Sequence, residues 1–156
     1  MKVSIGSDHR GVEERKCIID AVESAGCEAV DLGTHSAEPC DYPDVAMEVA
    51  KHVAQGDSDR GILICGTGIG VSMAANKVKG IRAALCKNVQ TAELSRQHNN
   101  ANVLCMGTID FDPELVRKMI GVWLTTDFEG GRHERRVNKI AAIQLEECSS
   151  PSSGDA

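Results

Sequence analysis

The stretch 61–72 reads Gly-Ile-Leu-Ile-Cys-Gly-Thr-Gly-Ile-Gly-Val-Ser, and it joins a short apolar run to a glycine-rich turn. The run 61–64 is typical of a buried parallel strand, and residues 69–76 continue the chain as a helix. Comparable apolar runs lie at 3–5, 29–32, 82–85 and 102–106. The sequence therefore predicts a parallel sheet of about five strands.

Segments with helical periodicity separate and follow these runs. The predicted helices cover 17–25, 43–56, 69–76, 89–96, 113–124 and 134–146. Alternation of strands and helices predicts an α/β fold, with a doubly wound sheet, right-handed crossovers and helices on both faces. We predict one domain over 1–148 and a disordered polar tail over 149–156. In such sheets ligands bind beyond the carboxyl ends of the strands, so the loops there hold the candidate site.

Composition excludes several classes of protein. The 156 residues carry a net charge of -6 and only 3% aromatic residues, which argues against nucleic-acid binding. From its polar residues, we expect neither a signal peptide nor a membrane span in the amino-terminal segment, and therefore a cytoplasmic protein. Seven cysteines without a C-x-x-C pair argue against a disulfide framework and against a zinc ribbon.

The glycine-rich turn does not match three common phosphate-binding motifs. A P-loop would need a lysine near Val71, a Rossmann fingerprint would need its third glycine one residue later, and a phosphatase loop would need arginine at 71. The glycines still allow close approach of a ligand to the backbone, and amides at a helix start favour negative charge. The same position favours a thiolate at Cys65, which is the cysteine we predict to be reactive. The alternative is a tight turn around an inert buried thiol.

Three further segments carry dense polar chemistry. Asp8 and His9 follow the first strand, where Asp8 is either a site residue or a helix cap. His98 ends a helix and has a side chain suited to proton transfer, although it can also simply terminate the helix. Arg132 and Arg136 lie four residues apart, so on a helix they share one face and can bind one anion.

These groups together describe one type of reaction. A thiolate base, backbone amides, a His/Asp pair and an arginine clamp suit proton transfer beside the carbonyl of a phosphorylated compound. Amide donors would stabilise the enediolate-like transition state. This chemistry requires no metal and no redox cofactor.

The sequence from Lys2 to Ile143 resembles the ribose-5-phosphate isomerase B family, which also contains galactose-6-phosphate isomerase subunits. The matching motifs lie at 7–9, 41–44, 65–70, 74–77, 95–99, 101–104 and 132–136. The resemblance implies an aldose–ketose isomerase that interconverts ribose 5-phosphate and ribulose 5-phosphate.

The resemblance also implies roles for individual residues. Asp8 and His98 would open the sugar ring, with His98 as the proton donor, and Cys65 would carry the proton from C2 to C1. Thr67 would assist catalysis at the sugar hydroxyls. Contacts to the enediolate are implied for Gly66, Gly68, Ile69 and Gly70. Contacts to the phosphate and the sugar are implied for His9, Asn99, Arg132 and Arg136.

The family has a Rossmann-like three-layer sandwich with its site between two subunits. That implies a homodimer, or a dimer of dimers, in which the C-terminal helix takes part and the arginines serve a partner's Cys65. Some relatives use a glutamate at position 71 as the base, and the pair Cys65 and Val71 resembles the thiol subgroup instead. Ile109 replaces an arginine that many members use for phosphate. Weaker phosphate binding, substitution by Arg10, or a different sugar are the alternatives.

Two other functions remain open. A hexose 6-phosphate isomerase, for allose or galactose, belongs to the same family, but galactose-6-phosphate enzymes divide their site between two different chains. A non-catalytic sugar-phosphate sensor would retain Arg132 and Arg136 and would have no use for a thiol beside His98.

Overall fold

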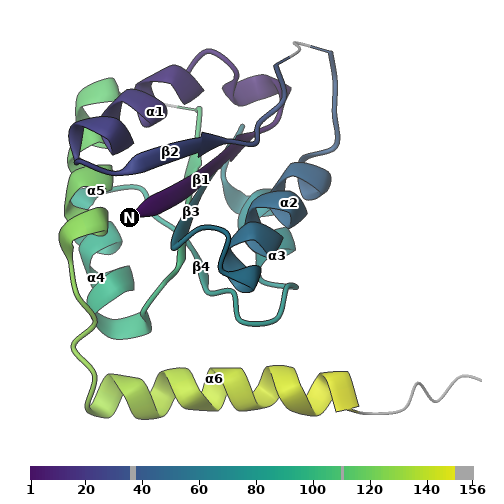
Figure 1. The fold of residues 1–156 in the computed structure, drawn as a ribbon, viewed down its shortest axis with the longest axis vertical. Coiled ribbons are helices and arrows are strands. Elements are labelled where there is room, and N and C mark those ends of the chain that lie inside the picture. The colour runs from purple at the N-terminus through teal and green to yellow at the C-terminus, as the bar shows by residue number, and fades with distance from the viewer. Residues whose placement is uncertain (36–37, 110, 150–156) are drawn as a thin grey trace, which may run out of the picture.

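The computed structural model describes residues 1–35, 38–109 and 111–149, which form a parallel sheet with helices on both faces (Figure 1). The strands are β1 (Lys2–Ser7), β2 (Glu28–Asp31), β3 (Arg60–Cys65), β4 (Ala83–Leu85) and β5 (Val103–Gly107). The helices are a short 3-10 turn η1 (His9–Gly11), α1 (Arg15–Ser24), α2 (Tyr42–Gln55), α3 (Ile69–Ala75), α4 (Val89–Asn99), α5 (Pro113–Thr125) and α6 (Arg132–Ser149). The predicted fold class and the five predicted strands are confirmed.

The strand order β2-β1-β3-β5-β4 fixes where a site can form. From β1 the chain moves outward to β2 and then returns to the other side of β1 as β3, so the direction of winding reverses between β1 and β3. Ser7 pairs with Ile64 in this register, which puts the loops after β1 and β3 side by side. Ligands of open sheets bind at such a switch point.

Two apolar clusters enclose the sheet. One contains Ile5, Ile18 and Trp123 and packs α1, α4 and α5 on one face, while the other contains Val49 and Val71 and packs α2 and α3 on the opposite face. Helix α6 lies outside these layers along the base of the view, where its first turns pack against α4 (Figure 1). Because α6 covers little of the core, most of its length is exposed.

Local signals set most helix ends. Pro43 occupies the first turn of α2, and Gly56 closes that helix with a φ of 82°. The Asn88 side chain accepts a hydrogen bond from the Thr91 amide at 2.8 Å and caps α4. Helix α6 is longer than the predicted 134–146, because it begins at Arg132 and ends at Ser149. Ser149, the first residue of the predicted tail 149–156, still belongs to α6, and residues 150–156 lie outside the described ranges.

Within the described ranges, none of the helices combines the length and apolar character that crossing a bilayer requires.

Candidate functional site

Cys65 ends β3 at the switch point and is 5% exposed. The Gly68 amide donates a hydrogen bond to its Sγ atom at 3.2 Å. The amide of the turn therefore points at the sulfur, which acts as the acceptor. The structure thus places one donor where the sequence predicts a reactive thiol at the start of a glycine-rich turn.

Gly68 holds this turn in shape. Its φ is +76°, and a Cβ atom there would lie 2.6 Å from Leu85 Cδ1 and 2.7 Å from the Met106 carbonyl carbon. The Thr108 amide donates to the carbonyl oxygen of Cys65 at 2.9 Å, which ties the turn to the end of β5. The loop therefore packs directly on backbone, and its amides cannot shift without moving β5.

The loop after β1 contacts this turn. Asp8 is 5% exposed, and its Oδ1 accepts from the Arg10 amide at 2.9 Å, so it caps η1. His9 Nδ1 accepts from the Cys40 amide at 3.3 Å. The Arg10 guanidinium lies over Gly66, where an added Cβ atom would be 3.0 Å from Nη1. Asp8 therefore does cap a helix, as one of its two predicted roles requires. Its carboxylate still lies at the edge of the switch point.

Two residues beside the loops after β1 and β3 have no role among the sequence-based predictions. The ring of Tyr42 lies against Gly70, where an added Cβ atom would be 2.5 Å from Cζ. Arg15 is 4% exposed, forms an ion pair with Asp31 at 3.0 Å and donates to Ser7 Oγ at 2.7 Å. The available signals were the tyrosine of the motif at 41–44 and an arginine two residues before the predicted helix 17–25.

A second polar cluster lies at the junction of α4 and α6. The rings of His98 and His133 stack with centroids 4.1 Å apart and an interplanar angle of 4°. Glu129 Oε2 lies 3.9 Å from His98 Nε2 and 3.5 Å from His133 Nε2. Arg132 Nε donates to His133 Nε2 at 3.3 Å. The cluster thus joins the predicted proton donor to the predicted arginine clamp.

Within one copy of the chain, these two clusters lie at opposite ends of the sheet. Gly61, near the start of β3, pairs with Val103, and its amide donates to the Asn102 carbonyl, so the segment that leaves α4 meets β3 at its amino end. Cys65 is four residues further along, about 13 Å at about 3.3 Å per residue. Within one copy of the chain, Cys65 and His98 therefore lie at opposite ends of the sheet.

The possible ligand atoms of His98, Glu129 and His133 lie within 4.8 Å of one another, a spacing compatible with a metal site. An imidazole ligand binds a metal ion in the plane of its ring. Two parallel stacked rings share no such plane, so one ion cannot ligate both without turning a ring. In the observed arrangement the two rings are therefore stacked partners and not joint ligands of one ion.

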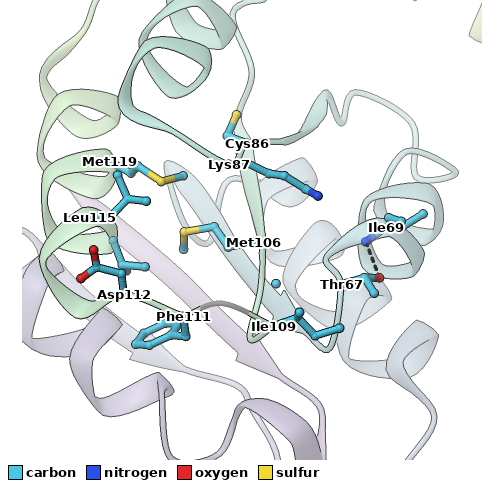
Figure 2. A pocket seen from close by; sticks show the side chains of 12 residues that line it. Thr67, Ile69, Cys86, Lys87, Met106, Ile109, Phe111, Asp112, Leu115 and Met119 are labelled. Carbon is cyan, nitrogen blue, oxygen red and sulfur yellow. Dashed lines mark hydrogen bonds between the residues drawn. The ribbon is translucent and has the colours of Figure 1, made fainter.

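A cavity of about 370 Å³ adjoins the glycine-rich turn on the side of β4 and α5 (Figure 2). Thr67, Ile69 and Ile109 form one wall, and methionine and leucine side chains line much of the rest. Cys65 is not among the lining residues. Lys87 and Asp112 are its charged lining residues, and the hollow neighbours the predicted site without containing its thiol.

Two other buried cysteines differ from Cys65 in their surroundings. Burial raises the pKa of the Cys86 thiol, although Ser95 and Thr91 act in the opposite direction through hydrogen bonds. Burial raises the pKa of Cys105 more strongly, with Cys86 and Cys65 adding to the effect. Both side chains therefore remain protonated thiols at neutral pH.

Comparison with known proteins decides the family. A sequence model described as Ribose/Galactose Isomerase matches residues 3–140. The chain belongs to this family. Membership confirms the resemblance noted in the sequence and the predicted enzyme class, an isomerase.

Individual members of the family are similar over nearly the whole chain. Ribose-5-phosphate isomerase B of Escherichia coli is 47% identical, covering 92% of this chain and 96% of the relative. The structure of the Clostridium thermocellum ribose-5-phosphate isomerase B superposes with a TM-score of 0.91 at 48% identity, covering 94% and 99% of the two chains. The Mycoplasma genitalium enzyme, solved with bound ribulose-5-phosphate, has a TM-score of 0.88 at 46% identity, covering 93% and 97%.

Proposed function

We propose that this enzyme interconverts ribose 5-phosphate and ribulose 5-phosphate, with Cys65 as the base. The observation that carries the proposal is the Cys65 sulfur at the switch point, with the Gly68 amide donating to it at 3.2 Å. The similarity to a protein solved with bound ribulose-5-phosphate supports this choice of substrate.

In the proposed mechanism, His98 donates a proton to the ring oxygen of the furanose while Asp8 accepts the proton of the C1 hydroxyl, which opens the ring. The Cys65 thiolate then removes the proton from C2, and the C1 carbonyl oxygen gains the negative charge. The C2 hydroxyl proton then passes to O1 while the carbon-bound proton returns from Cys65 to C1, which gives the ketose, and Asp8 and His98 recover their starting forms by proton exchange with solvent. Cys65 ends each turnover in the form in which it began.

The remaining candidate residues hold the substrate in this scheme. Amides of Gly66, Gly68, Ile69 and Gly70 face the developing charge of the enediolate, and Thr67 contacts a sugar hydroxyl. His9 and Asn99 contact the phosphate and the sugar, respectively. Arg132 and Arg136 are exposed and one helical turn apart, which suits a phosphate clamp.

Because one copy separates Cys65 from His98, we propose that a second copy completes each site, in a homodimer or a dimer of dimers. The partner would supply His98, Asn99 and the two arginines to the loops after β1 and β3. Exposed apolar side chains support an interface on α3 and α6, since Met73 is 64% exposed and Ile143 is 61% exposed.

Substitutions at Arg10 and Ile109 test how the enzyme binds the phosphate of the substrate. Ile109 is 62% exposed, and its amide donates to the Gly66 carbonyl at 3.1 Å, so an arginine at 109 would sit beside the loop. The Arg10 guanidinium already lies over Gly66. We expect Arg10→Ala to raise KM for ribose 5-phosphate about tenfold, the loss of one charge-assisted hydrogen bond.

In that background, Ile109→Arg should restore most of the affinity, and Ile109→Ala is the matched control without a charge. Steady-state kinetics of the variants measures both effects. An unchanged KM in Arg10→Ala would show that Arg10 does not take over from the family's arginine.

The proposed substrate is tested by comparing turnover of ribose 5-phosphate, allose 6-phosphate and galactose 6-phosphate. We expect the highest kcat/KM with ribose 5-phosphate. A higher value with either hexose would change the substrate while keeping the reaction type. Binding of all three without turnover would support a sensor instead of an enzyme.

A further inference from the structure

His133 stands at the centre of the second cluster and has no role in the mechanism above. It is 5% exposed, although both of its neighbours in the chain are exposed. Its ring stacks on His98, and its Nε2 atom accepts from Arg132 Nε at 3.3 Å. One side chain thus touches both the proposed proton donor and one arm of the proposed phosphate clamp.

The hydrogen bond from Arg132 defines the protonation state of His133. A guanidinium only donates, so Nε2 must present a lone pair, and the ring is then neutral with its hydrogen on Nδ1. A proton arriving at Nε2 would break this bond. The Glu129 carboxylate, 3.5 Å from the same nitrogen, would then become its partner.

The charged groups around His133 favour the neutral ring. Its pKa lies below the ordinary value of 6.5 because of burial first, and then because of His98 on α4 and Arg132 on its own helix. Arg136 adds to this lowering, and Glu129, from the segment before α6, opposes it. Near neutral pH His133 is therefore an acceptor for Arg132.

We propose that His133 is a positioning residue that fixes Arg132 for the substrate phosphate while its ring supports His98. This role rests on the proposed function, which gives Arg132 the phosphate and His98 the proton. Acidification would protonate His133, release Arg132 and so weaken substrate binding. The hydrogen bond and the ring stack give His133 two separable effects, one on KM and one on kcat.

His133→Phe separates these effects because it keeps a flat ring and removes the acceptor. At about pH 8 we expect its KM for ribose 5-phosphate to be about fivefold above wild type, and its kcat to stay within about threefold. The ratio of the two KM values should fall toward unity as the pH drops through the lowered pKa of His133, because wild type then loses the same bond. The phosphate also titrates near pH 6, but it does so in both proteins and cancels in the ratio.

His133→Gln is the conservative partner, since its amide oxygen accepts but does not titrate. We expect its KM at about pH 8 to lie within about twofold of wild type, with a lower kcat because the ring stack is lost. Once the pH lies below the lowered pKa of His133, the KM of this variant should be below that of wild type. This variant carries the test alone if His133→Phe does not fold, as judged by circular dichroism.

His52→Phe serves as the control, because His52 lies on α2, on the opposite face of the sheet from α4. Its KM ratio to wild type should be near unity at every pH. A KM ratio for His133→Phe that is raised but constant with pH, or near unity at pH 8, would overturn the role of His133. A wild-type protein without turnover would overturn the proposed function instead.

Discussion

Cys65→Ser is expected to lower kcat for ribose 5-phosphate by about 10³-fold, within the range that a positioned acid or base contributes. A serine hydroxyl is almost the same size and can still accept the Gly68 hydrogen bond seen at 3.2 Å. It is far less acidic than a thiol, so it does not supply a base near neutral pH. KM should change little, because the phosphate contacts lie elsewhere.

Cys17→Ser is the matched control for this substitution. Cys17 is a half-buried thiol on α1, and its Sγ lies 4.0 Å from the Pro113 carbonyl oxygen, away from both clusters. Its kcat should equal that of wild type. Wild-type turnover in Cys65→Ser would remove the thiol from the mechanism.

Gly68→Ala is expected to lower both activity and stability strongly. A φ of +76° costs an alanine about 1–2 kcal/mol. The new methyl group would also lie 2.7 Å from the Met106 carbonyl carbon, so the loop or β5 must move. We expect the free energy of unfolding to fall by about 3 kcal/mol and kcat/KM to fall at least about 100-fold.

Gly26→Ala separates strain from crowding. Gly26 has the same φ of +76° but nothing within 4 Å of an added Cβ atom. Urea denaturation should therefore show a loss of about 1 kcal/mol, with unchanged activity. Equal losses of stability in the two variants would show that contact with Met106 is not what constrains the loop.

The first half of the site was accessible from sequence because each of its parts is local. Strand β3, the three glycines and Cys65 occur in one continuous stretch, and the loop with Asp8 also directly follows a strand. That the two loops meet follows from the reversal of winding between β1 and β3. This reversal is a property of strand order, which the apolar runs alone do not specify.

The second half depends on tertiary packing. His98 and His133 stack because the first turns of α6 pack against the end of α4. Glu129 is held beside them because its amide donates a hydrogen bond to the Gln97 carbonyl at 3.0 Å. Glu129 and His133 are four residues apart, but no spacing in the sequence relates either of them to His98. Tyr42 was missed for the same reason, since its contact with Gly70 joins α2 to α3.

The separation of Cys65 from His98 makes the central claim testable, namely that each site takes Cys65 from one copy and His98 from another. Neither Cys65→Ala nor His98→Gln should turn over ribose 5-phosphate alone. Joint refolding of the two variants should restore about a quarter of wild-type activity, because half of random dimers are mixed and each mixed dimer has one intact site. A mixture that stays inactive, although native mass spectrometry shows mixed dimers, would contradict the shared site.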